Sequence, residues 1–156
     1  MNIRIIILYL SLVFVGYSCD IKDKSAQSEN NIDAARNFIR SALDGKFNDA
    51  RSYMLQDSLN NNYLDVAERS YKNADQAVKD GYKGSTIIIH TVNDVNDSTS
   101  FVIYSNSFKN DHDTLRVIKS DNQWVVDLKY LYEHDADTLL NKVITNDTVK
   151  WSKIFF

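Results

Sequence analysis

The stretch Thr114–Leu128, TLRVIKSDNQWVVDL, decides the fold. Two runs of mostly β-branched and large apolar residues flank the dipeptide Asp121-Asn122, whose residue types suit a two-residue turn. The stretch therefore predicts an antiparallel hairpin, and the short turn fixes its register. Counted outward from the turn, the expected pairs are Ser120–Gln123, Lys119–Trp124, Ile118–Val125, Val117–Val126, Arg116–Asp127 and Leu115–Leu128.

This register gives the hairpin two different faces, because successive side chains of a strand point to opposite sides. One face is mainly apolar, and we expect it to form the floor of the main core. The other face carries a pair of opposite charges. The apolar face comprises Leu115, Val117, Trp124, Val126 and Leu128, whereas the opposite face holds Ile118, Val125 and the Arg116–Asp127 pair.

Upstream of the hairpin, the apolar periodicity predicts three helices followed by two more strands. The first helix is expected at Asp33–Leu43, capped by Asn31 or Asp33 and closed by Gly45. A short second helix is expected to begin at a cap at Asn48, and a third is expected at Ser58–Lys79, where Gly81 stops it. The strands are expected at Ser85–Val92, Thr99–Phe108, Thr114–Lys119 and Gln123–Leu131. Helices followed by an antiparallel meander predict an α+β fold, with the N-terminal helices packed on the sheet.

The N-terminus has the features of a secretory signal. Arg4 supplies one positive charge, and the apolar run Ile5–Val15 is shorter than the roughly 20 residues that span a bilayer. Cys19, the single cysteine, lies where a bacterial lipoprotein signal is cut, which the segment resembles. This resemblance implies a lipid on Cys19 and a protein anchored to a membrane of the bacterial cell envelope, at the periplasmic face or the cell surface. An ordinary signal peptide or an uncleaved anchor is the alternative.

Four segments are therefore expected along the chain. Residues 1–18 form the signal peptide, residues 19–31 the lipidated cysteine with a polar tether, residues 32–131 the α+β domain and residues 132–156 a C-terminal extension. Within the extension, Asp137–Ile144 fits a short helix. Thr148–Phe156 fits either a strand that joins the sheet or an apolar docking tail.

Composition excludes several classes of function. A formal net charge of −3 and the lack of a run of Lys or Arg argue against nucleic acid as a partner. A single cysteine excludes a thiol-based zinc site. Phosphate-binding loops, dinucleotide fingerprints and GxSxG elbows do not occur in the sequence, so no cofactor is expected.

Two residues are the candidates for a catalytic role. His90 lies within a predicted strand and can act as a general base in a cavity, although a histidine on a partly solvated strand is the simpler interpretation. Asp127 can move a proton in the same way, but the predicted register sets Arg116 opposite it, which favours an ordinary cross-strand ion pair. His112 and His134 lie between acidic residues without a recognised metal-ligand spacing, and solvated loops account for both. The tyrosines can line a pocket or pack at the edges of a small core.

The helical motif AxxFxxxALxGxFxxA resembles the opening helices of a known family, the small bacterial lipoproteins of unknown function with a cystatin-like domain related to nuclear transport factor 2 (a SnoaL-like domain). The turn and tryptophan in Ser120–Val126 are similar to that family's final hairpin. The resemblance implies a curved antiparallel sheet that wraps a long helix and leaves a cone-shaped cavity. The motif residues are Ala35, Phe38, Ala42, Leu43, Gly45, Phe47 and Ala50.

Relatives of this family include polyketide cyclases, steroid isomerases and non-catalytic binding domains, so the fold alone does not choose a function. The expected function is a lipid-anchored envelope protein whose non-catalytic domain binds a small apolar ligand or a protein partner. The alternative is a cyclase- or isomerase-type enzyme that uses His90 or Asp127 as its base. An enzyme requires one of these side chains to point into a closed pocket.

Overall fold

Five helices and four strands make up residues 28–133, the part of the chain that a computed structural model describes. The expected signal peptide, Cys19 and most of the tether lie outside the described residues, as do Asp137–Ile144 and Thr148–Phe156. In chain order the elements are α2 (Asn31–Leu43), α3 (Phe47–Ser52), α4 (Ser58–Asn73), α5 (Gln76–Gly84), β1 (Ile87–Asn96), β2 (Thr99–Asn106), β3 (Asp113–Ser120), β4 (Gln123–Asp127) and α6 (Lys129–Glu133). This order confirms the α+β prediction.

The strands form one antiparallel sheet in the order β1-β2-β3-β4. The hairpin register is confirmed from Ser120↔Gln123 to Arg116↔Asp127. Asp121 and Asn122 both have positive φ, at 47° and 66°, which is the backbone of a type I′ turn. The short turn therefore sets the pairing, as the sequence predicts.

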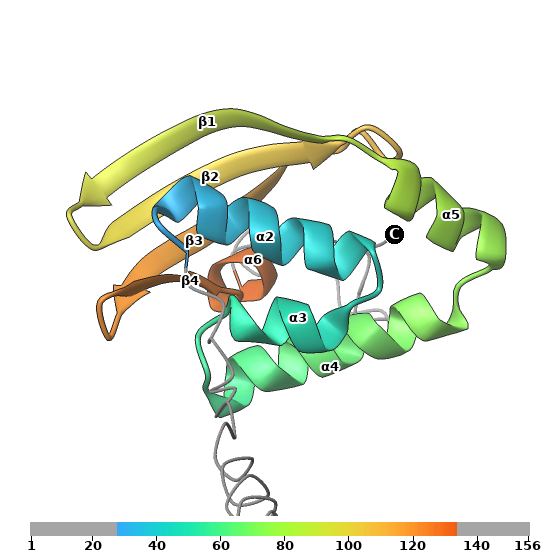
Figure 1. Ribbon diagram of the computed structural model, residues 1–156, viewed down its shortest axis with the longest axis horizontal. Coiled ribbons are helices and arrows are strands. Elements are labelled where there is room, and N and C mark those ends of the chain that lie inside the picture. Colours follow the sequence, from blue (N-terminus) through green and yellow to red (C-terminus); the bar gives the residue numbers. More distant parts are fainter. Residues whose placement is uncertain (1–27, 134–156) are drawn as a thin grey trace, which may run out of the picture.

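Helix α2 lies across the sheet, with α3 and α4 beyond it (Figure 1). The core between α2 and the sheet is filled by large apolar side chains, and the expected apolar face of the hairpin lies within it. Trp124, also on that face, is only partly buried and packs against the cluster. Fully buried side chains of this core include Phe38, Leu43, Met54, Leu64, Val102, Leu115, Val117, Val126 and Leu128.

Both ends of α2 have defined caps. The N-cap is Asn30, whose side chain accepts a hydrogen bond from the backbone N–H of Asp33 at 2.9 Å, so the expected cap at Asn31 or Asp33 is wrong by one position or more. The expected closing role of Gly45 is confirmed, because it follows the helix with a φ of 75°. The folded domain thus begins within the residues expected to be tether.

The third predicted helix is wrong in its extent, because the chain breaks it in two. Ala74 has extended backbone with φ −69° and ψ 153°, and α5 starts two residues later. Gly81 lies inside α5 and does not stop it. A Cβ at Gly81 would lie 2.3 Å from Cε2 of Phe108, so this glycine allows the Phe108 ring to approach α5. Leu59, in the first turn of α4, is 49% exposed.

Several further boundaries differ from the expected ones: for example, β1 starts at Ile87 and not at Ser85, and β2 ends at Asn106 and not at Phe108. Helix α3 begins after Lys46 and is not capped by Asn48. Strand β1 continues to Asn96, beyond the β-branched run, and its pairing with β2 carries two register shifts. The last strand ends at Asp127, and the chain turns into α6, so the expected strand residues 129–131 are helical.

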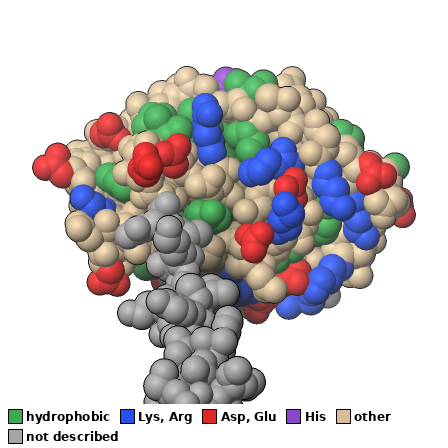
Figure 2. Space-filling model, viewed as in Figure 1, with side chains coloured by type: hydrophobic (Ala, Val, Ile, Leu, Met, Phe, Trp, Pro, Cys, Tyr) green, Lys and Arg blue, Asp and Glu red, His purple; other side chains and the backbone are tan. Residues whose placement is uncertain are grey.

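Among the described residues no helix has the length and apolarity needed to cross a membrane. Basic and acidic side chains are interspersed over the face seen in Figure 2.

Candidate functional site

His90 lies at a bulge of β1, between the paired residues Ile89 and Thr91. Its Nε2 is 2.8 Å from Oγ of Ser105 on β2, and its ring contacts that of His112 with centroids 4.1 Å apart. Both imidazoles are exposed on the surface. The structure thus brings together two of the histidines of the sequence analysis, and their contact holds the loop before β3 against β1.

This histidine pair lacks the surroundings of a catalytic or metal site. Asp111, next to His112, forms an ion pair with Lys109 at 3.4 Å. Within residues 28–133, no three His, Cys, Asp or Glu side chains are grouped so that they could hold a metal ion. His90 does not line either of the two cavities described for this part of the chain. His134 lies outside the described residues.

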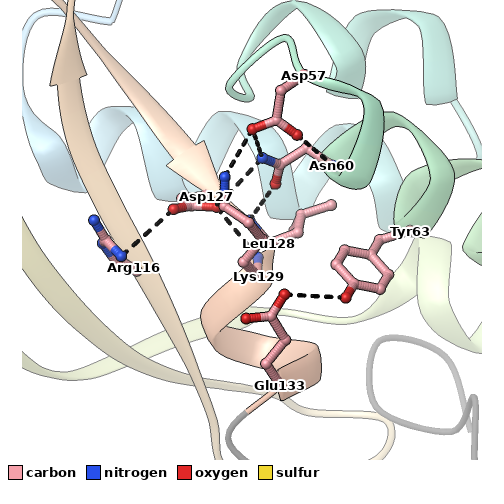
Figure 3. A network of polar contacts seen from close by, with 8 residues as sticks. All are labelled: Asp57, Asn60, Tyr63, Arg116, Asp127, Leu128, Lys129 and Glu133. Carbon is pink, nitrogen blue, oxygen red and sulfur yellow. Dashed lines mark hydrogen bonds and ion pairs between the residues drawn. The ribbon is translucent and has the colours of Figure 1, made fainter.

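Asp127 is 1% exposed and lies in a network of polar contacts at the end of β4 (Figure 3). Its Oδ2 is 3.7 Å from Arg116, which bears out the expected cross-strand ion pair. Its Oδ1 is 3.5 Å from Nζ of Lys129 and accepts a hydrogen bond from Nδ2 of Asn60 at 3.3 Å. The carboxylate is therefore held between two cations and an amide.

Asn60 is the centre of this network. Its side chain is fully buried, and its Oδ1 accepts a hydrogen bond from the backbone N–H of Leu128 at 2.6 Å. The side-chain amide also donates to Asp57 Oδ2 at 3.0 Å. Every polar atom of a buried amide thereby has a partner, which avoids a large desolvation penalty. The network joins the start of α4 to the point where the chain leaves β4.

Asp57 and Lys129 complete the network with an ion pair of 2.7 Å. The backbone N–H of Asn60 and then the ammonium of Lys129 stabilise the carboxylate of Asp57, which lowers its pKa to about 2. The same carboxylate raises the pKa of Lys129. Sequence reasoning found the Arg116–Asp127 pair but missed Asn60 and Lys129, because no local pattern links residues that lie 67 positions apart, as Asn60 and Asp127 do.

The geometry around Asp127 suits a structural role better than proton transfer. A general base needs access to a substrate proton within hydrogen-bond reach. Asp127 is covered by its partners, and it lines neither of the two cavities described in residues 28–133. The enzyme alternative of the sequence analysis thus gains no support from either candidate residue.

The larger of the two cavities is a surface groove of about 500 Å³ beside β4. One wall comes from α3 and the segment after it, and the other wall comes from the β3–β4 hairpin. Both apolar and polar side chains face the groove. The lining residues include Asn48, Ser52, Met54, Leu55, Gln123 and Val125.

The groove lies along an edge of the sheet that is only partly paired. Met54 forms a parallel bridge with Val126, in which Val126 N–H donates to Tyr53 O at 2.9 Å and Leu55 N–H donates to Val126 O at 2.8 Å. Trp124, two residues earlier, has its backbone N–H and C=O on the same edge. Among the described residues, no hydrogen bond from another segment reaches these two groups.

The tyrosines of residues 28–133 pack within the structure and do not line the groove. Tyr82 and Tyr104 are buried, and burial raises the pKa of Tyr82 to about 12 and that of Tyr104 well above its ordinary value. Tyr63 on α4 stacks on Tyr132, and Tyr130 contacts Phe101. The simpler expectation, that they pack around a small core, fits these contacts.

Comparisons of the chain with protein-family models, with curated proteins and with solved structures find no match. The resemblance to lipoproteins with a cystatin-like domain therefore stays a prediction. The groove beside β4 is a candidate ligand site in residues 28–133, and the sequence did not indicate it. Residues 28–133 thus form an α+β domain with a packed core and a sheet edge that is only partly paired.

Proposed function

We propose that this protein is a lipid-anchored component of the bacterial cell envelope, and that its domain binds a protein partner without catalysis. The anchor rests on the signal-like N-terminus and on Cys19. The polar residues after Cys19 then act as a tether that keeps the domain clear of the lipid headgroups. The domain itself is of the cystatin-like type, with α2 across the antiparallel sheet.

A protein partner is favoured over a small apolar ligand. Buried side chains occupy the space between α2 and the sheet, where a cone-shaped cavity would hold such a ligand. The open volume of about 500 Å³ lies instead at the surface, beside a sheet edge with free backbone groups. Backbone groups of this kind bind polypeptide through main-chain hydrogen bonds. This groove is the observation that carries the proposal.

Mass spectrometry of the membrane fraction tests the anchor. The native protein is expected to carry a diacyl or triacyl group on Cys19, and Cys19→Ala to be released or left uncleaved. Each buried methylene contributes about 0.8 kcal/mol to membrane binding, so several chains hold the protein firmly. An unmodified Cys19 in the mature protein contradicts the anchor.

Photo-crosslinking in living cells tests the partner. A photoreactive residue at Ser52, in the groove, is expected to form an adduct with one reproducible envelope protein. The same residue at the exposed Ser58, at the start of α4, serves as the control. If neither Ser52 nor other exposed positions such as Val95 give an adduct, this result contradicts protein binding.

A further inference from the structure

We propose that the groove beside β4 receives an extended polypeptide segment, which adds to the sheet at Trp124 by main-chain hydrogen bonds. This inference rests on the proposed protein-binding function and names the chemistry of that partner. The partner is an unpaired, extended chain segment with an apolar side chain at the position that faces the groove. The argument depends on the direction of the backbone groups, on how the edge is occupied and on the lining of the groove.

The register of the hairpin determines where the backbone groups of Trp124 point. A two-residue turn makes Ser120 and Gln123 the first hydrogen-bonded pair, so the next pair, Lys119 and Trp124, does not exchange hydrogen bonds. The N–H and C=O of Trp124 therefore point away from β3. Val126, which has the same orientation, confirms this direction because its N–H and C=O bond to Tyr53 and Leu55.

The chain's own segment covers only half of this edge. Helix α3 continues to Ser52, so the backbone before Tyr53 is helical and does not follow β4. After Leu55 the chain turns away, and the side chain of Gln56 donates to the carbonyls of Arg51 and Met54. The parallel bridge is thus limited to Met54 and Val126. An added segment at Trp124 would continue the line of pairing that Tyr53–Leu55 begins.

The lining of the groove suits a main-chain interaction with modest side-chain selectivity. Leu55 and Val125 supply apolar surface, whereas Ser52 and Gln123 supply hydrogen-bonding groups. Arg51 is held by Asp65 at 2.6 Å and by Asn61, so its charge is already compensated. Asp121 also lines the groove, so its carboxylate and the compensated Arg51 disfavour an anionic ligand and favour an extended segment without acidic side chains.

The opposite edge of the sheet is less suited to strand addition. Strand β1 carries register shifts between Ile89 and Thr91 and between Asp94 and Asn96. Bulges of this kind disrupt the regular row of donors and acceptors and discourage pairing with another chain. The edge at Trp124 carries no such irregularity in its pairing with β3. The β4 edge is therefore the site to which we assign strand addition.

A displayed library of random dodecapeptides tests the assignment, with the full-length protein in detergent as the target. Selected peptides are expected to slow hydrogen exchange of the Trp124 amide at least tenfold and to leave β1 amides unchanged. Ser52→Trp and Gln123→Trp fill the groove from opposite walls, and each is expected to weaken peptide binding at least tenfold, or about 1.4 kcal/mol. Ser58→Trp, outside the groove, is the matched control and is expected to stay within about twofold of the native affinity.

Each outcome decides the matter. Circular dichroism of the three variants establishes that they are folded, and the two groove variants act as independent tests. A selection that yields no binding peptide, or peptides that bind the groove variants as tightly as the native protein, overturns the assignment. Peptide binding at Trp124 in a protein that yields no cellular adduct leaves this inference standing and removes the proposed function. Adducts from Val95 but not from Ser52 support the proposed protein binding and overturn the assignment of the groove as its site.

Discussion

The Oδ1 atom of Asn60 accepts a hydrogen bond from the backbone N–H of Leu128, 68 residues later, at 2.6 Å. This contact satisfies the first backbone donor beyond β4, where no neighbouring strand is available to do so. The chain can therefore leave the sheet at Asp127 and enter α6 without a buried unpaired N–H. The side-chain amide of Asn60 also reaches Asp57 and Asp127, so one residue couples the helical layer to the end of the sheet.

Asn60→Ala is expected to lower the free energy of unfolding by about 2–3 kcal/mol, because it leaves buried polar groups unpaired. The N–H of Leu128 and the carboxylate of Asp127 each lose a partner in this variant. Urea denaturation measures the loss. Asn62→Ala, at an exposed position of the same helix, is the control and is expected to change stability by less than about 0.5 kcal/mol. Equal effects of the two substitutions contradict the role assigned to Asn60.

Stability should fall in acid as Asp57 becomes protonated. Its pKa is lowered from 3.8 to about 2 by the N–H of Asn60 and by Lys129. A carboxyl group whose pKa is lower in the folded state stabilises the fold above pH 3.8, and this contribution disappears as the pH falls toward 2. Asp57→Asn keeps a capping oxygen but does not titrate. Urea denaturation of both proteins from pH 6 to about pH 2.5 should show a shallower decline for the variant. Parallel curves would exclude Asp57 as the source.

The sequence predicted those parts of the fold that depend on local signals. The turn at Asp121-Asn122 fixed five residue pairs, and the apolar stripe of α2 ended at Gly45 as expected. The α4–α5 break was missed because Ala74 is a good helix former and no glycine or proline marks the change. Tertiary contacts decide such breaks. Here Arg40 donates to the carbonyls of Tyr82 and Ser85 and holds the end of α5 against α2.

For the candidate sites too, the sequence predicted contacts that depend on local pairing and missed those that depend on tertiary packing. The ion pair of Asp127 with Arg116 followed from the register, because cross-strand neighbours can be counted from a turn. The partners Asn60 and Lys129 depend on how α4 and α6 approach the sheet, and no periodicity encodes that approach. The groove beside β4 likewise arises where α3 ends before the chain reaches Tyr53. Sequence patterns predict elements and pairs, whereas gaps between elements require the assembled structure.

Gly45→Ala is expected to destabilise the fold by about 1–3 kcal/mol. Gly45 has a φ of 75°, which disfavours a side chain, and a Cβ there would lie 2.6 Å from Cε1 of Tyr71. The Tyr71 ring is buried against Phe47, so it has little room to move. Gly84→Ala is the matched control, because no atom lies within 4 Å of a Cβ at that position. We expect Gly84→Ala to be neutral or to stabilise by up to about 1 kcal/mol. Similar thermal unfolding midpoints for the two variants contradict the steric argument.

Alkaline unfolding should be governed by buried tyrosines, and Tyr82 gives the clearest test. Burial and the carboxylates of Asp113 and Asp111 raise its pKa from 10.0 to about 12. A tyrosine whose pKa is higher in the folded state stabilises the fold fully below pH 10, and this contribution is lost as the pH rises through about 12. Tyr82→Phe removes the ionisable group and keeps the ring that packs on Phe108. Urea denaturation from pH 8 to about pH 11.5 should therefore show a smaller decline for the variant than for the native protein. Ultraviolet absorbance of tyrosinate supplies a second measurement, in which the native protein should show one more late-titrating tyrosine than the variant. An equal decline in stability with equal absorbance curves would place Tyr82 in contact with solvent and contradict its position beneath the Phe108 ring.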